Sequence, residues 1–460
     1  MQYDIGKYSY LDDYKDIFSE FVKDCRNHYI IPAEAFSHHL VKRGLREADG
    51  SGVMAGITKK GNAHGYIISE GERSPIKGQL IYCGYNVEEL IGGVIKENRF
   101  GFEESAYILL FGHLPTQEKL QKFDSILDAC RHLPPRFTED IIMKAPTPSL
   151  MNKIATSVLA LYAYDDNPDD ISLDNLLRQS MELMARIPVI AAHAYSVYSN
   201  VFHGKSLTLH NPHENLSTAQ NFLCVLRPDK TFTDEEAKLL DLCLILHAEH
   251  GGGNNSTFTC RVVSSTATDT YSAISAAIGS LKGPRHGGAN IKVQEMFECM
   301  KKGIKDYNDD DEILAFLRAI LRGEECDGSG LIYGMGHAVY TISDPRAVLL
   351  KDRARKLAEE KGYSEDFKLL EAVERLTPAA FAAERGIYRN ICANVDLYSG
   401  LVYQMLDIPI ELYTPLFAIA RIAGWCAHRI EECYTSNKII RPAYKCIARP
   451  KEYIPLKDRV

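Results

Sequence analysis

Residues 117–133 read QEKLQKFDSILDACRHL, and this stretch shows the pattern that dominates the chain. Leu120, Phe123, Leu127 and Cys130 recur at three- and four-residue intervals, which is the spacing of one face of an α-helix. Two consecutive prolines follow at 134–135 and end the predicted helix. Patterns of this kind continue from residue 87 nearly to the end of the chain, so the sequence predicts a mainly α fold.

Two helix starts are marked by their residue types. Residues 233–236 read TDEE, a capping-box pattern that predicts a helix running to His247. Asp344 followed by Pro345 predicts an N-cap and the first position of another helix.

The N-terminal region differs from the rest. Residues 1–50 are predicted to be helical and polar, ending near Gly44. Residues 51–84 are rich in glycine and contain the short apolar runs 66–68 and 79–82, which favour a small strand or hairpin. We therefore expect a small β element near the N-terminus.

Composition and charge narrow the class of protein. The chain has 460 residues and a formal net charge of −8, which argues against nucleic acid as the main partner. The N-terminal stretch resembles neither a secretory signal nor a transit peptide, and no apolar run is long enough to span a membrane. The twelve cysteines form no C-x-x-C pair, so we expect reduced, buried thiols and a cytoplasmic location.

Three histidines stand beside glycines. His250 follows His247 by three residues and precedes three glycines, so it is either a helix-end cation or part of a tightly bent ligand loop; His247 itself is expected to be structural. His286 lies in GPRHGGAN (283–290), an irregular loop that favours function over packing. His337 follows Gly334-Met335-Gly336, which alone is weak evidence for a site.

Charged residues complete the candidates. Arg346 begins the helix after Asp344-Pro345 and is a candidate carboxylate clamp, with a surface ion pair as the alternative. Asp396 lies in the apolar segment ICANVDLYSGLVY, so it is either hydrogen-bonded for structure or a base with a raised pKa. Arg421 and Arg441 follow. Together these residues fit proton abstraction next to a carbonyl in a multiply anionic substrate.

Seven ordered segments resemble the citrate synthase family over roughly residues 40–445. They are GFEESAYILLFGHLPT (101–116), LILHAEHGGGNNSTFT, GPRHGGAN, GHAVY with DPRA, NVDLYSG (394–400), RIAGWCAH (421–428) and KIIRP (438–442). The resemblance implies a helical fold with a large domain (1–286 and 404–460) and a small domain (287–403) that closes over the site. It also implies a homodimer, with higher oligomers left open, in which Arg441 reaches the partner's site.

The resemblance further implies residue roles. His286 would hydrogen-bond the thioester carbonyl of acetyl-CoA, Asp396 would remove a methyl proton, and His337 would polarise the keto carbonyl of oxaloacetate. His250, Arg346, Arg421 and Arg441 match positions that bind the dicarboxylate or the product. The products would be citrate and CoA, with no metal and no cofactor, because coenzyme A enters as a substrate.

Three alternatives stay open from the sequence. A 2-methylcitrate synthase would use propionyl-CoA, and one methylene changes pocket energy by only about 1–3 kcal/mol. A metal-dependent hydrolase would use His247, Glu249 and His250, although their order does not match H-E-x-x-H. A non-catalytic CoA-binding relative is the third.

Overall fold

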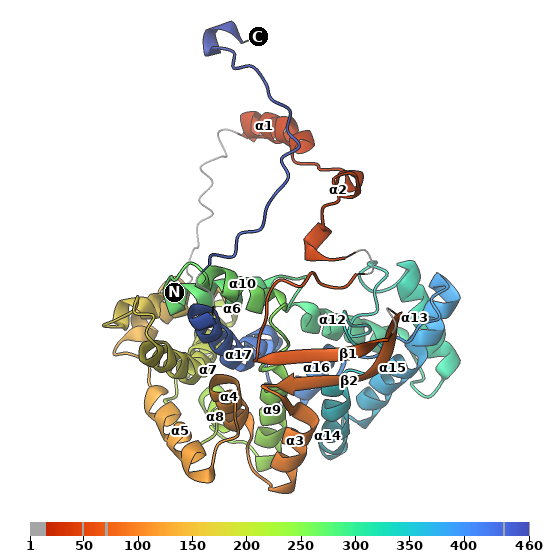
Figure 1. Cartoon of the computed structure of the whole chain (residues 1–460). Helices are drawn as coiled ribbons and strands as arrows, with labels where there is room; N and C mark the ends of the chain where they lie inside the picture. Colours follow the sequence, from red (N-terminus) through yellow and green to blue (C-terminus); the bar gives the residue numbers. More distant parts are fainter. Residues whose placement is uncertain (1–14, 48–49, 70–71, 436–437, 460) are drawn as a thin grey trace. The chain divides into compact units, whose positions relative to one another are not determined.

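The computed structural model describes residues 15–47, 50–69, 72–435 and 438–459 (Figure 1). Two compact units divide the chain, Gly56–Ile439 and a smaller one made of Met1–Ala55 with Ile440–Val460. The mainly α prediction is confirmed, as is the β element near the N-terminus. The predicted division into 1–286 with 404–460 and 287–403 does not coincide with these units and stays a prediction.

The larger unit holds one small sheet and most of the helices. The sheet has the order β1-β2-β3, made of β1 (Gly61–Ser69), β2 (Glu72–Tyr82) and β3 (Tyr85–Asn86), and each strand is antiparallel to its neighbour. The helices are α3 (Val87–Lys96), α4 (Phe102–Phe111), α5 (Gln117–Cys130), α6 (Leu150–Ala160), α7 (Leu173–His203), α8 (Thr218–Leu226), α9 (Asp234–His247), α10 (Asn255–Ser264), α11 (Thr270–Lys282), α12 (Ala289–Gly303), α13 (Asp310–Arg322), α14 (Pro345–Lys361), α15 (Ser364–Arg385), α16 (Val395–Met405) and α17 (Tyr413–Thr435). Short helical turns occur at Thr138–Met143, Leu161–Tyr164 and Ile410–Leu412.

The smaller unit contains α1 (Lys15–His28), α2 (Ala33–His38) and the turns Arg43–Leu45 and Leu456–Asp458. Helix was predicted for residues 1–50, and the two helices confirm it in part: residues 29–32 and 39–42 are not helical, and residues 1–14 and 48–49 lie outside the described residues. Arg441 belongs to this unit and is exposed there.

The predicted helix starts are confirmed at the level of hydrogen bonds. Thr233 and Glu236 form a reciprocal capping box at the start of α9. The side chain of Asp344 caps α14 by accepting from the backbone N–H of Arg346, with Pro345 at the first turn. The helix predicted from residues 117–133 is α5, which begins after its N-cap Thr116.

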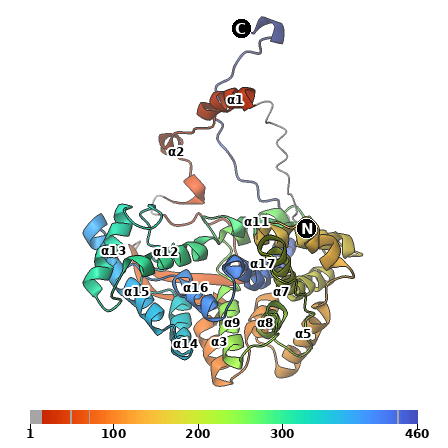
Figure 2. The ribbon, with the colours of Figure 1, turned by 180° about the vertical axis from the view of Figure 1, so that it is seen from behind.

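Helix α17 forms the centre of the core. Residues 413–429 are all buried, including the one tryptophan of the chain, Trp425. Figure 2 shows α17 among the other helices, and it packs on α4, α6, α7, α9, α10, α11 and α12. A helix buried on every side is expected to be apolar throughout. The polar residues that α17 carries therefore need a specific explanation.

The β1–β2 hairpin packs closely on the segment that follows His337. A Cβ atom added at Gly65 would lie 2.6 Å from the carbonyl oxygen of Val339, and one added at Gly78 would collide with the carbonyl oxygen of Ser343. Because only glycine permits these approaches, the two glycines fix the hairpin against residues 339–343.

The cysteines differ from the prediction. Cys299, near the end of α12, forms a disulfide with Cys326 in the loop after α13, with the Cα atoms 5.7 Å apart. The prediction of reduced, buried thiols is wrong for this pair, and Cys25 and Cys446 are exposed. The physical reason is that the fold brings together positions 27 residues apart, which the spacing of cysteines along the chain does not reveal.

We expect alkylation of the denatured, unreduced chain to modify ten cysteines, and twelve after reduction, as counted by mass spectrometry. The Cys299–Cys326 disulfide joins positions 27 residues apart. In the chain-entropy model, closing a loop of that length stabilises a fold by about 3.5 kcal/mol, so Cys326→Ser should lower the melting temperature. Cys446→Ser, at an exposed unpaired cysteine, is the matched control and should leave it unchanged. Twelve alkylated cysteines without reduction would contradict the pairing.

Candidate active site

The candidate residues come from five separate segments. His250 follows α9, His286 lies in the loop between α11 and α12, and His337 lies in the loop before α14. Asp396 lies in the first turn of α16, and Arg421 in the middle of α17. The structure joins two of these segments directly: the backbone N–H of Asn394 donates to the carbonyl oxygen of Gly334 at 2.9 Å, and that of Gly336 donates to Cys392 at 2.7 Å.

Asp396 is held at the start of its helix. The side chain of Asn394 accepts from the backbone N–H of Asp396 at 3.0 Å and caps α16. Burial raises the pKa of Asp396 to about 6, although the positive charge of Arg346 opposes this shift. A carboxylate with such a pKa is ionised near neutral pH and is a stronger base than an ordinary aspartate.

His337 is held as a neutral ring of defined tautomer. Its Nδ1 accepts from the backbone N–H groups of Val339 at 3.0 Å and Tyr340 at 3.1 Å. The proton of the neutral ring therefore lies on Nε2, which is 3.5 Å from a guanidinium nitrogen of Arg346. Burial, reinforced by Arg346, lowers the pKa of His337 to about 4. At neutral pH the ring is a neutral donor through Nε2.

His286 has the opposite tautomer. Its Nε2 accepts from the backbone N–H of Ser256 at 3.4 Å and lies 3.1 Å from the Ser256 hydroxyl. The proton of the neutral ring therefore lies on Nδ1. Burial, with a contribution from Arg421, lowers the pKa of His286 to about 4. Trp425 donates to the same hydroxyl at 3.3 Å, which ties this loop to the central helix.

The two buried arginines among the candidate residues differ in their partners. Arg346 is 4% exposed and is bound to Asp344 through Nε at 3.0 Å and a terminal nitrogen at 2.7 Å. Arg421 is 2% exposed and donates through Nε to the carbonyl oxygen of His247 at 2.5 Å. Among the described residues, no carboxylate lies within ion-pair distance of Arg421, so its charge is available to an anionic ligand.

His250 and His247 have separate environments. His247 is fully buried, stacks on Phe417 and lies 3.0 Å from the Tyr403 hydroxyl, which agrees with a structural role. The ring of His250 meets that of His337 edge to face at 5.1 Å. Its buried Nε2 has no hydrogen-bond partner in the described part of the chain. An unpaired buried nitrogen beside His337 is expected of a ligand contact.

Electrostatic coupling shows that these groups surround one place. Burial lowers the pKa of His250 well below its usual value, and Arg346, His337, Arg421 and His286 all add to this shift. Arg346 and Arg421 likewise oppose the rise in the pKa of Asp396. The structure therefore gathers six predicted residues into one cluster: His250, His286, His337, Arg346, Asp396 and Arg421. Arg441 lies in the other unit and stays a prediction.

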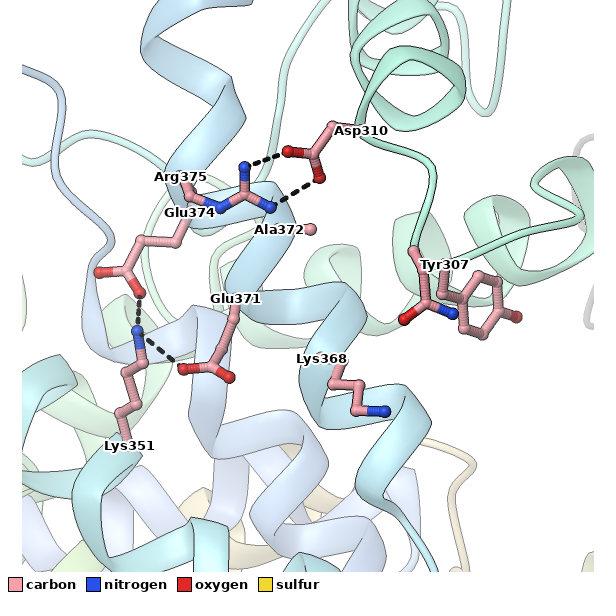
Figure 3. A pocket seen from close by; sticks show the side chains of 9 residues that line it. Tyr307, Asp310, Lys351, Lys368, Glu371, Ala372, Glu374 and Arg375 are labelled. Carbon is pink, nitrogen blue, oxygen red and sulfur yellow. Dashed lines mark hydrogen bonds and ion pairs between the residues drawn. The ribbon is translucent and has the colours of Figure 1, made fainter.

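A cavity elsewhere does not compete with this cluster. A pocket of 530 Å³ lies between α13, α14 and α15 and contains none of the predicted residues (Figure 3). Two of its cations are paired with carboxylates of the pocket, Lys351 with Glu374 at 2.8 Å and Arg375 with Asp310. The third, Lys368, is paired with Glu365 beside the pocket. A pocket whose cations are already matched by nearby carboxylates offers little net charge to a ligand.

The metal-site alternative finds no support in the geometry. Glu249 is bonded to His428 and to the backbone N–H of Gly251, while His247 is directed to Tyr403. These two side chains therefore point to different partners. Among the described residues, no group of three or more His, Cys, Asp and Glu side chains is arranged to hold a metal ion. The described part also has no helix both long and apolar enough to cross a membrane.

Sequence reasoning missed several supporting residues. Ser256 sets the tautomer of His286, Asp344 holds Arg346, and Tyr340 stacks on His337 at 4.6 Å. Asp344 was noted only as a helix cap. Its position two residues before an arginine was the signal that could have found the ion pair, whereas Ser256 lies 30 residues from His286 and gave no signal.

Comparisons with known proteins agree with this arrangement. A family model described as citrate synthase, C-terminal domain, matches residues 62–443. A citrate synthase of Synechocystis is 35% identical over 83% of this chain and 89% of its own, and 2-methylcitrate synthase 1 of Corynebacterium glutamicum is 32% identical over 84% and 93%. The Thermoplasma acidophilum citrate synthase, solved as a ternary complex with carboxymethyl coenzyme A and oxaloacetate, has a TM-score of 0.72 at 27% identity over 88% of this chain and 97% of its own. With the fold, the ordered segments and the family match in agreement, this chain belongs to the citrate synthase family.

Proposed function

We propose that this protein condenses oxaloacetate with acetyl-CoA and water to give citrate and CoA. The observation that carries the proposal is the cluster in which Asp396, with a pKa raised to about 6, is placed with two neutral histidines and with Arg421, whose guanidinium has no ion-pair partner among the described residues. A weak carbon acid can be deprotonated only if its enol is stabilised as it forms, and this set contains both the base and the donors.

Each residue has a proposed role that follows from its protonation. Asp396 removes a proton from the acetyl methyl group, while Nδ1–H of His286 donates to the thioester oxygen. Nε2–H of His337 donates to the keto oxygen of oxaloacetate, and the enol carbon attacks the keto carbon. Arg346, Arg421 and His250 hold the carboxylates, and water then hydrolyses the citryl thioester to release CoA. The proposal includes no metal and no cofactor.

The test of this function is steady-state kinetics with acetyl-CoA and propionyl-CoA side by side. We expect CoA release that requires oxaloacetate and a kcat/KM for acetyl-CoA at least about tenfold above that for propionyl-CoA, because one methylene is worth about 1–3 kcal/mol in a fitted pocket. Preference for propionyl-CoA would favour the 2-methylcitrate synthase alternative, which the relatives also include. Acyl-CoA binding without turnover would indicate a non-catalytic relative.

The pH profile tests the assignment of the base. Asp396 must be ionised to act, and since its pKa is raised above the usual value, its active form is lost as the pH falls through about 6. His286 and His337 stay neutral down to about 4, so they add nothing to this limb. We expect the rate to fall with a one-proton slope and a midpoint near 6, with circular dichroism confirming that the fold persists. A rate that stays unchanged down to pH 5 would contradict the assignment.

Assembly and location are also part of the proposal. A homodimer in which Arg441 serves the partner's site is supported by family membership and by the position of this arginine outside the larger unit. A cytoplasmic location is supported by the ten unpaired cysteines and opposed by the Cys299–Cys326 disulfide.

A hybrid experiment tests the shared site. Arg441→Ala and Asp396→Ala are each expected to be inactive as homodimers. A heterodimer purified through two different tags should regain about half of the wild-type activity, because one of its two sites then has both intact residues. The homodimeric single variants, mixed without subunit exchange, are the control. A verified heterodimer without activity would show that Arg441 does not cross between subunits.

A further inference from the structure

A buried carboxylate stands next to the proposed oxaloacetate site without an assigned role. Glu249 is fully buried, and its Oε1 accepts from the backbone N–H of Gly251 at 2.5 Å and from Nε2 of His428 at 3.0 Å. Its second oxygen, Oε2, has no hydrogen-bond partner among the described residues. Since an unpaired buried carboxylate oxygen is costly, this arrangement needs a compensating interaction.

The His428 ring connects Glu249 to a chain of charges. His428 is fully buried, and its Nδ1 accepts from Arg261 at 3.1 and 2.7 Å, which leaves the proton on Nε2 facing Glu249. Arg261 is in turn paired with Glu431 and with Glu432, the latter at 2.7 Å. The ring therefore has one possible orientation, with an acceptor toward α10 and a donor toward Glu249.

Two glycines make room for this carboxylate. A Cβ atom at Gly424, in α17, would lie 2.5 Å from Oε2 of Glu249, and one at Gly61, in β1, would lie 2.5 Å from Oε1. The backbone of α17 thus approaches the Glu249 side chain too closely for a Cβ atom at position 424. This packing holds Glu249 between the central helix and the sheet.

Glu249 is linked to two residues of the proposed dicarboxylate site, His250 and Arg421. His250 is the next residue, so the bond from Gly251 to Glu249 closes the turn around it. Arg421 lies seven residues before His428 on α17, on the same side of the helix. The negative charge of Glu249 acts on Arg421, opposing the lowering of its pKa by burial, yet the two form no direct ion pair in the described structure.

We propose that Glu249 and His428 are positioning residues for oxaloacetate: Glu249 balances the charge of Arg421 from outside ion-pair distance and fixes the turn that carries His250, while His428 holds Glu249 in place. This inference rests on the proposed function. The guanidinium of Arg421 is thereby kept charged and oriented without a direct ion pair, so that a substrate carboxylate can bind it. A direct ion pair at Arg421 would compete with the substrate.

The test compares the KM values for the two substrates. Glu249→Gln keeps the shape but removes the charge, and we expect the KM for oxaloacetate to rise by roughly tenfold or more, as for loss of a buried charged hydrogen bond. The KM for acetyl-CoA, measured at saturating oxaloacetate, should change less than about twofold. His428→Phe should have the same effect, and His428→Gln should restore part of the affinity, because an amide can accept from Arg261 and donate to Glu249.

The matched control is Glu103→Gln. Glu103 is also buried, accepts from the backbone N–H of Thr218 at 2.6 Å and lies 3.9 Å from Arg131, but it has no link to His250 or Arg421. Its substitution should lower stability without altering either KM. If Glu249→Gln does not fold, the comparison of His428→Gln with His428→Phe carries the test.

Two outcomes would overturn the proposal. One is an unchanged KM for oxaloacetate in a folded Glu249→Gln or His428→Phe protein, and the other is an equal rise in both KM values, which indicates a merely structural role. An inactive wild-type protein would instead contradict the proposed function. The wild-type assay therefore separates the two failures.

Discussion

Arg421 is a permanent positive charge in the middle of α17, the helix around which the larger unit is packed. Burying a guanidinium without a paired carboxylate is strongly unfavourable unless a ligand or a nearby charge compensates it. Here the compensation is divided between the His247 carbonyl oxygen, the more distant Glu249 and, in our account, a substrate carboxylate. The fold thus retains in its core a charge that only the bound substrate fully satisfies.

Burial, together with the charges of Arg346 and Arg421, determines the protonation of the site residues. Burial keeps the surrounding histidines neutral rather than cationic. Arg421 adds to this effect at His286 and His250, and Arg346 adds to it at His250 and His337. The backbone N–H groups of Val339, Tyr340 and Ser256 then decide which ring nitrogen carries the proton. Asp396 remains basic because burial outweighs the two arginines. Electrophilic donors and a base can therefore coexist at neutral pH.

The helix starts and the helical pattern were predicted from the sequence because they depend on residues that are close together along the chain. The capping box at Thr233, the cap at Asp344 and the apolar spacing in α5 all involve residues within a turn or two, so local patterns sufficed. The six clustered residues were found through family segments rather than through geometry. Contacts between distant positions were not predictable: Glu249 meets His428 across 179 residues, and Cys299 meets Cys326 only because two helices return to one place. Partner choice of this kind depends on tertiary packing.

The most direct test of the central claim is isotope exchange at the acetyl methyl group. With an unreactive oxaloacetate analogue bound, the wild-type protein should release tritium from methyl-labelled acetyl-CoA to water, and Asp396→Asn, which keeps the shape but not the basicity, should release it at least about 10²-fold more slowly. Asp407→Asn, at an exposed aspartate just beyond α16, is the matched control and should exchange normally. Exchange at the wild-type rate in a folded Asp396→Asn protein would show that another residue is the base and would contradict the account.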